Sequence, residues 1–293
     1  MDFRDDAQLD ASQVEDARGS GGGRMPGGMM LGGGAVGLVV TIVALVFGLD
    51  LTGGSGPERQ QPAGQVGSGT NLSAQCRSGA DADQSQDCRI VGTVNSIQSY
   101  WNKQFTSDGR RYVPAKTQLF SQATQTRCGY ATSDVGPFYC PADQKVYLDL
   151  TFFNELQQRF GAEGGPFAQA YVVGHEYGHH IQNLLGVMSR GQSGAKGATS
   201  GSVRLELQAD CYAGTWAKNA VSTGFLTQLT ETDVRQALSA AEAVGDDSIQ
   251  RRSQGHVNPD GFTHGTSEQR RRWFTTGYQS GDPRSCDTFS GSI

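Results

Sequence analysis

The sequence lacks the patterns that mark several classes of protein. Its 293 residues contain no Cys-x-x-Cys pair, no Gly-x-Ser-x-Gly motif, no long basic stripe and no internal repeat. The first absence argues against a cysteine-based zinc site, and the second against a serine hydrolase of that type. With a net charge of −5 and no basic stripe, there is no reason to expect a nucleic-acid partner.

Two polar stretches near the N-terminus have too few apolar side chains to bury a core. Residues 1–28 are polar and rich in glycine, so we expect a disordered tail there. Residues 50–75 are rich in Gly, Ser, Gln and Pro, a composition that predicts a flexible linker. The folded domain is therefore expected over residues 76–293.

Residues 29–49 carry no charge before Asp50 and are mostly apolar. The run is long enough to cross a bilayer as one helix, which needs about 20 residues. Arg18 and Arg24 precede it, whereas the next basic residue after it is Arg59. The positive-inside rule therefore predicts a cytoplasmic N-terminus, a single-pass transmembrane helix and an extracytoplasmic domain, in the periplasm or at the cell exterior.

Two other readings of this apolar run are a cleaved signal peptide and a buried core helix. The long acidic leader and the lack of an Ala-x-Ala site weigh against a signal peptide. The glycine-rich tracts beside the run weigh against a core helix. We therefore favour a membrane anchor.

All six cysteines follow the apolar run, and their number is even. Three disulfides formed in an oxidising compartment explain this better than buried free thiols, which are the alternative. Six cysteines can pair in many ways, but two short loops suggest two of the pairs and leave the third. The expected pairs are Cys76–Cys88, Cys128–Cys140 and Cys211–Cys286.

Apolar periodicity and turn residues predict a mostly helical domain with two short strands. The strands, residues 136–141 and 145–150, are joined by a turn over residues 142–144, and the polar residues 246–262 predict a loop. The fold class is therefore α+β, with a small sheet or hairpin beside the helix that begins at Pro166. The expected helices are residues 90–105, 152–160, 166–185, 202–221, 231–244 and 266–278.

Within the helix over residues 166–185 lies the pattern His-Glu-x-x-His, formed by His175, Glu176 and His179. Residues four apart share one face of a helix, so the two imidazoles can hold one Zn²⁺ ion. Glu176 beside them can act on a water molecule as a general base. The alternative is a buried helix whose histidines only satisfy hydrogen bonds, but the ligand spacing favours the metal.

A catalytic zinc site usually has three protein ligands, and Glu206 is the candidate for the third. Glu206 and Asp210 are four residues apart in an otherwise mostly apolar helix, so their carboxylates share a face. Buried carboxylates need partners, which a metal centre supplies. We expect Glu206 to be the ligand, and Asp210 to accept a hydrogen bond from a ligand imidazole.

Several phrases carry a resemblance to a known family. His175-Glu176-x-x-His179 followed by Glu206-x-x-x-Asp210 resembles the gluzincin pattern of zinc metallopeptidases. The phrases GPFYCPADQKVYLDLTFF, VVGHEYGHHIQ, ELQADCYAG and HGTSEQRRRWFTTGY resemble the bacterial neutral zinc metallopeptidase family (YpfJ-like) over about residues 70–293. The resemblance implies a membrane-anchored, zincin-like domain.

His264 and Arg270 resemble the His-Pro…Arg element of the membrane-associated Ste24/HtpX-type peptidases, although Gly265 replaces the proline. That resemblance implies that His264 donates a hydrogen bond to the oxyanion and that Arg270 supports Asp210 or the substrate. The alternatives are a capping box formed by Thr266 and Gln269, and a solvated basic face containing Arg270. His180 points away from the predicted zinc face and is expected to be structural.

The strand over residues 145–150 precedes the metal-binding helix. Zinc proteases usually bind an extended substrate by adding it to an exposed sheet edge, so this strand is our candidate edge. An ordinary core hairpin held by Cys128–Cys140 is the alternative.

The sequence therefore predicts a membrane-anchored zinc metallopeptidase that hydrolyses peptide or protein substrates. One alternative is a zinc-stabilised scaffold or binding protein that performs no catalysis, which would have no use for Glu176. Another is a zinc hydrolase that cleaves amide bonds of the cell wall, which the expected export makes reasonable.

Overall fold

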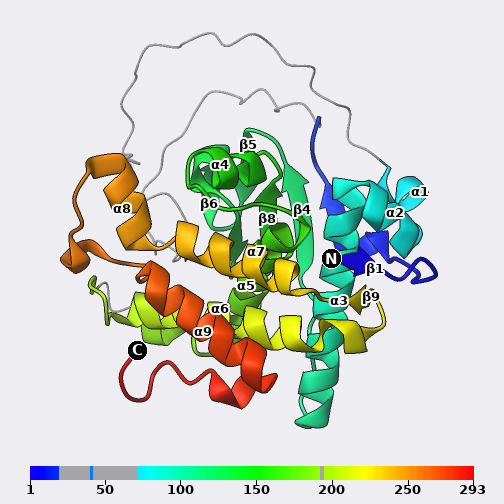
Figure 1. Cartoon of the computed structure of the whole chain (residues 1–293). Coiled ribbons are helices and arrows are strands. Elements are labelled where there is room, and N and C mark those ends of the chain that lie inside the picture. Colours follow the sequence, from blue (N-terminus) through cyan, green and yellow to red (C-terminus); the bar gives the residue numbers. More distant parts are fainter. Residues whose placement is uncertain (20–39, 42–70, 192–194) are drawn as a thin grey trace, which may run out of the picture.

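A computed structural model describes residues 1–19, 40–41, 71–191 and 195–293 of the chain (Figure 1). Its fold is α+β with helices predominating, as the apolar pattern predicts. The α-helices are α1 (Leu72–Gln75), α2 (Gly79–Gln84), α3 (Gln86–Ser107), α4 (Phe152–Gln158), α5 (Pro166–Leu184), α6 (Gly201–Asn219), α7 (Glu231–Ala243), α8 (Asp246–Gln254) and α9 (Ser267–Ser280).

The strands within the described residues form three small sheets. The largest has the order β2-β4-β8-β7-β3; β2, β4 and β8 are parallel, and β7 is antiparallel to β8 and β3. The antiparallel pairs β1–β9 and β5–β6 form the other two sheets. The strands are β1 (Asp2–Phe3), β2 (Val14–Asp16), β3 (Val40–Thr41), β4 (Lys116–Phe120), β5 (Ala123–Thr126), β6 (Gly129–Thr132), β7 (Phe138–Cys140), β8 (Lys145–Asp149) and β9 (Leu226–Gln228).

Helix α5 lies at the centre of the domain. It begins with Pro166 at the first helical position, where the missing N–H costs nothing, and Gly186 follows its end with a φ of 73°. From Phe167 to Gln182 all but one of its side chains are buried. One side of α5 meets the large sheet, where the Tyr177 hydroxyl lies 3.1 Å from the Thr117 hydroxyl. Another side packs on α6 and α7 (Figure 1).

Gly178 allows the close approach of α5 and α6. A Cβ atom at this position would lie 2.8 Å from Cα and 2.9 Å from the carbonyl oxygen of Ala209, closer than real Cβ contacts come. Any larger residue would force the two helices apart. The absent side chain therefore brings the histidines of α5 within reach of the carboxylates of α6.

The segment before residue 20 is folded, so the expectation of a disordered tail over residues 1–28 is wrong for residues 1–19. Strand β2 pairs in parallel with β4, and β1 pairs with β9 near the end of α6. Phe3 is 2% exposed and packs on Gly92 of α3, and the Met1 ammonium group binds the buried carboxylate of Asp233. A sequence with few apolar residues can still fold when another part of the chain supplies the core and the sheet.

The expected membrane segment, residues 29–49, lies outside the described residues except for Val40–Thr41, which form β3. Among the described residues, none of the helices is long and apolar enough to cross a membrane. Because residues 1–19 pack on the domain that follows, both lie on the same side of any bilayer. A cytoplasmic tail and an extracytoplasmic domain joined by one crossing are incompatible with this packing. The expected linker over residues 50–75 also lies outside the described residues as far as residue 70, and the expectation is wrong for residues 72–75, which form α1.

Replacing Phe3 with alanine tests whether the N-terminal segment is part of the fold. We expect the free energy of unfolding to fall by about 3 kcal/mol, because a buried aromatic ring is lost and a cavity remains. Urea denaturation of the parent protein and of the Phe3→Ala variant measures this difference. Asp5→Ala, an exposed change in the same segment, should have almost no effect. Equal stability of the Phe3 variant and the parent would show that the segment does not dock in solution.

The predicted polar loop over residues 246–262 is wrong in its first part, because residues 246–254 form α8. Only Ile249 supplies a buried apolar residue there, so the helix has no apolar stripe to predict it. Its charges suit a helix instead, with aspartates in the first turn and arginines in the last. Gly255, with a φ of 73°, ends the helix.

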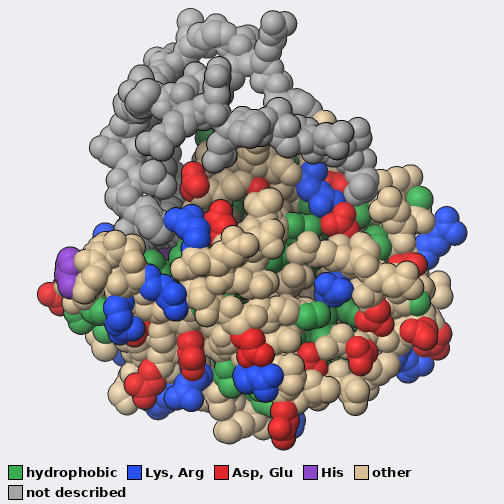
Figure 2. Space-filling model, turned by 45° about the horizontal axis from the view of Figure 1, so that its top comes forward, with side chains coloured by type: hydrophobic (Ala, Val, Ile, Leu, Met, Phe, Trp, Pro, Cys, Tyr) green, Lys and Arg blue, Asp and Glu red, His purple; other side chains and the backbone are tan. Residues whose placement is uncertain are grey.

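The hairpin of β7 and β8 is confirmed, but the proposed substrate edge is not. Strand β8 lies inside the sheet between β4 and β7, so it has no open edge. The alternative of a core hairpin is correct. All three predicted disulfides are present, and Cys128–Cys140 ties β7 to the turn between β5 and β6. On the face shown in Figure 2, acidic and basic side chains are intermixed over the surface.

Candidate metal centre

Helices α5 and α6 bring three possible metal ligands together. His175 and His179 of α5 and Glu206 of α6 are all buried, and one ligand atom from each lies within 4.8 Å of the others. The Nε2 atoms of the two histidines are 3.2 Å apart. The Glu206 carboxylate oxygens lie 3.1 Å from Nε2 of His175 and 3.4 Å from Nε2 of His179. The predicted ligand set therefore forms a single cluster.

The other nitrogen of each imidazole is already engaged. Nδ1 of His175 lies 2.8 Å from an Asp210 carboxylate oxygen, and Nδ1 of His179 lies 2.9 Å from the side-chain oxygen of Gln182. Both partners accept, so each Nδ1 carries a proton, and each Nε2 faces the cluster and can present a lone pair to a metal ion. Two such lone pairs and a carboxylate oxygen repel one another unless a cation lies between them.

The donor atoms also suit zinc by chemistry and spacing. Two imidazoles and one carboxylate are a common ligand set of catalytic zinc. Tetrahedral bonds of about 2.0–2.1 Å place neighbouring ligand atoms about 3.3 Å apart, close to the separations between the three side chains. The residues present therefore fit a single zinc ion.

The charges around the cluster favour a cation at its centre. Burial alone would raise the pKa of Glu206, but the neighbouring histidines outweigh it and lower the pKa to about 2. Burial would lower the pKa of His175, but Asp210 and Glu206 raise it to about 9. Burial lowers the pKa of His179 to about 4. The cluster thus holds one carboxylate ionised and attracts positive charge to His175.

Zinc affinity should therefore fall as the pH falls. Below a pKa of about 9 for His175, zinc must displace a proton from the imidazole, which costs up to about tenfold in affinity per pH unit for one proton. Competition with a chromophoric chelator at pH 6, 7 and 8 measures the affinity. His256→Gln, which removes an exposed histidine, should keep the same pH dependence. A constant affinity over this range would contradict the raised pKa of His175.

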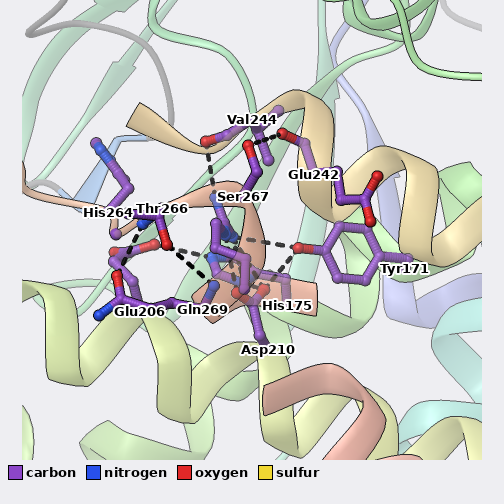
Figure 3. A network of polar contacts seen from close by, with 12 residues as sticks. Tyr171, His175, Glu206, Asp210, Glu242, Val244, His264, Thr266, Ser267 and Gln269 are labelled. Carbon is purple, nitrogen blue, oxygen red and sulfur yellow. Dashed lines mark hydrogen bonds and ion pairs between the residues drawn. The ribbon is translucent and has the colours of Figure 1, made fainter. Parts of the chain in front are cut away.

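A buried network of hydrogen bonds contacts His175 at Nδ1 (Figure 3). Asp210 accepts hydrogen bonds from the Tyr171 hydroxyl at 2.6 Å and from Arg270 at 2.8 and 2.9 Å. Arg270 and Asp210 are both fully buried, and Arg270 also donates to the carbonyl oxygen of Val244. Burial would raise the pKa of Asp210, but Arg270 and His175 hold it below its ordinary value. Asp210 therefore orients His175 as an ionised carboxylate, in the position predicted for it.

The two C-terminal candidates have different surroundings. His264 is 3% exposed, lies beside Glu206 in Figure 3, and is close enough for the Glu206 charge to act on it. Thr266 and Gln269 do form the capping box of α9. A solvated face is the wrong description of Arg270, which contacts Asp210, but it suits Arg271, whose side chain is 53% exposed.

Tyr171 and Gln182 belong to the site but were not among the predicted residues. Tyr171 is four residues before His175, and Gln182 is three residues after His179, so both lie on the ligand face of α5. That spacing is the signal that could have identified them. His180 is structural, as predicted: its Nε2 donates to the Val113 carbonyl oxygen at 2.7 Å.

Glu176 is a buried acidic side chain that the fold does not explain. It is fully buried, and neither carboxylate oxygen has a hydrogen-bond partner within the described part of the chain. Burial raises its pKa to about 8, and the charges of His175, Glu206 and His264 act on it. A buried carboxylate without partners costs folding free energy. It therefore points to a ligand or a reaction at this position.

The fold and the site define an α+β protein with a candidate metal site of two histidines and one glutamate, a ligand set that catalytic zinc uses in other proteins. A family model described as "Putative neutral zinc metallopeptidase" matches residues 1–289. The chain belongs to this neutral zinc metallopeptidase family. Membership supports a zinc peptidase function at the level of the family.

The chain also resembles curated proteins over most of its length. It is 49% identical over 256 residues to the uncharacterized protein Rv2575 of Mycobacterium tuberculosis (strain H37Rv), covering 85% of this chain and 86% of that protein. It is 42% identical over 299 residues to the uncharacterized protein YpfJ of Escherichia coli (strain K12), covering 97% and 98%. No solved structure matches the chain.

Proposed function

We propose that this protein is a zinc metallopeptidase that hydrolyses peptide bonds with Glu176 as its general base. The observation that carries the proposal is the Glu176 carboxylate, which is buried beside the ligand cluster without a hydrogen-bond partner among the described residues. A scaffold protein would need the three ligands but not this carboxylate. The proposed hydrolysis needs it as the general base.

His175, His179 and Glu206 would hold the ion. When bound, zinc lowers the pKa of a water molecule and polarises a carbonyl group. Glu176 takes the proton from the attacking water and returns it to the departing amine nitrogen. A pKa raised to about 8 by burial suits this exchange near neutral pH.

His264 has the second role in this proposal. An N–H of its ring donates a hydrogen bond to the carbonyl oxygen as negative charge develops there. Arg270 acts through Asp210, keeping that carboxylate ionised and His175 in one tautomer. The buried positions of both residues support these roles.

Metal analysis and hydrolysis assays test the proposed function together. The purified full chain should bind one zinc ion per molecule and deplete peptides from a mixed library. A chelator should abolish the hydrolysis, and added zinc should restore it. Zinc binding without hydrolysis of any peptide or protein would favour the scaffold, and cleavage of peptidoglycan alone would favour the cell-wall hydrolase.

We propose further that the protein works outside the cytoplasm. The three disulfides support an oxidising compartment. Attachment to the membrane through residues 29–49 is also part of the proposal, but residues 1–19 and the domain that packs on them must share one side of the bilayer. Labelling an Asp5→Cys variant with a thiol reagent that cannot cross the membrane tests on which side of the membrane residue 5 lies.

A further inference from the structure

The loop that carries His264 is held by a carboxylate from another element. Asp246 is the first residue of α8, and one of its oxygens accepts the backbone N–H groups of Thr263 at 2.8 Å, His264 at 2.7 Å and Gly265 at 3.0 Å. The backbone N–H of Asp246 in turn donates to the carbonyl oxygen of Gly265 at 2.8 Å. These bonds fix the loop to the start of α8.

The second oxygen of Asp246 reaches the ring itself. It lies 3.3 Å from Nδ1 of His264, and both side chains are 3% exposed. The Thr263 hydroxyl lies 2.9 Å from the same nitrogen. A carboxylate that only anchored a loop would need the first oxygen alone. The contact with Nδ1 instead gives the ring a preferred orientation and a proton at that nitrogen.

Charged groups from four helices surround the ring of His264. Asp246 of α8, Glu206 of α6 and Arg270 of α9 act on it, and its own charge acts on Glu176 of α5. The burial of His264 lowers its pKa, but the hydrogen bond to Asp246 and the charge of Glu206 outweigh this and raise the pKa. The Asp246 carboxylate beside Nδ1 therefore favours a proton on that nitrogen, as in other carboxylate–histidine pairs.

We propose that Asp246 is the positioning residue for His264, holding its Nδ1 edge so that the Nε2–H edge is presented to the substrate carbonyl oxygen at the metal centre. This inference rests on the proposed function and adds a residue to it. Asp246 does not touch the substrate; it acts through His264 alone. Nothing in the spacing of the sequence connects the two, because they meet only through the packing of α8 against the loop before α9.

A double-mutant cycle tests this dependence. Asp246→Asn keeps the shape of the side chain and one accepting oxygen, but it replaces the charge. We expect kcat for peptide hydrolysis to fall about 10- to 100-fold, with KM changed less than about twofold. In the His264→Ala background the same change should cost nothing more, because the group it acts through is gone. An equal loss in both backgrounds would overturn the proposal.

Asp247→Asn is the matched control. Asp247 is the next residue of α8 and accepts hydrogen bonds from the backbone and hydroxyl of Ser267 at the start of α9. It makes the same kind of contact at the start of α9, but its polar contacts among the described residues are with Ser267 and Arg251, not with His264. We expect kcat to stay within about twofold of the parent. A loss equal to that of Asp246→Asn would show that anchoring the loop is sufficient.

Nitrogen NMR of the full chain labelled at histidine gives a readout that does not depend on activity. The ring of His264 should carry a proton on Nδ1 in the parent and in Asp247→Asn, and lose it in Asp246→Asn. A parent ring without that proton refutes the positioning role. If zinc-loaded parent protein hydrolyses no peptide, the proposed function has failed, and these spectra alone decide whether Asp246 orients His264.

Discussion

Replacing Glu176 with glutamine is expected to lower kcat for peptide hydrolysis by about 10²- to 10⁴-fold, the usual contribution of a general base. Zinc content should not change, because Glu176 is not one of the three clustered ligands. An amide has nearly the same size as the carboxylate, so KM should also stay close to that of the parent. Metal analysis and initial rates with the peptides identified by library digestion measure these three quantities.

The same substitution should stabilise the zinc-free fold near neutral pH. The folded protein holds Glu176 protonated up to a pKa of about 8 because of burial, whereas the unfolded chain ionises near the ordinary value of about 4.3. Stability of the parent therefore falls as the pH rises between these two values, and the glutamine variant escapes that loss. Thermal unfolding at pH 5 and pH 8 should show a larger difference at pH 8.

Glu155→Gln is the control for both effects. Glu155 is a glutamate of α4 that pairs with Arg159, and its side chain is 35% exposed. Its loss should leave kcat and the pH dependence of stability nearly unchanged. A Glu176→Gln variant that hydrolyses peptides as fast as the parent would remove the general base from the mechanism.

Replacing Arg270 with alanine should cost about 3–5 kcal/mol of unfolding free energy, because it leaves the buried Asp210 carboxylate without its cationic partner. For a domain of this size, the melting temperature should fall by roughly 6–20 °C. Zinc affinity should fall about 10- to 100-fold as well, because Asp210 no longer holds His175 in a single orientation. Calorimetry and a chelator competition measure the two effects.

Arg271→Ala provides the matched control for this prediction. Arg271 is the next residue of α9, and its ion pair with Glu242 is about half exposed on both sides. Removing it should cost less than about 1 kcal/mol. Asp210→Asn should recover part of the stability of the Arg270 variant, because it removes the charge left unpaired. Equal stabilities of the Arg270 and Arg271 variants would contradict the buried network.

Much of the metal centre could be predicted because its spacing is local. His175 and His179 share a face of one helix, and Glu206 and Asp210 share a face of another, whatever the rest of the fold. The short loops between cysteines predicted two of the disulfides, and the two remaining cysteines form the third. Thr266 and Gln269 formed the capping box that was considered as an alternative, and such a box also depends only on neighbouring residues.

Two of the errors have a different origin, since they concern pairings between distant segments. The core of the N-terminal segment comes from α3, and the partner of β2 is β4. The position of β8 inside the sheet depends on two other strands. Such contacts leave no periodic pattern in the segment concerned, so a polar stretch was taken as a tail and an internal strand as an edge.

By itself, the sequence determined which side chains share a helical face, where the helices of the metal centre begin and end, and which cysteines lie a short loop apart. Only the tertiary structure decided that α5 and α6 meet at Gly178 and Ala209, that Arg270 is buried against Asp210, and that Asp246 lies against the ring of His264. The physical reason is that helical spacing is a property of the local backbone, whereas the partner of a buried charge is chosen by the packing of the whole chain.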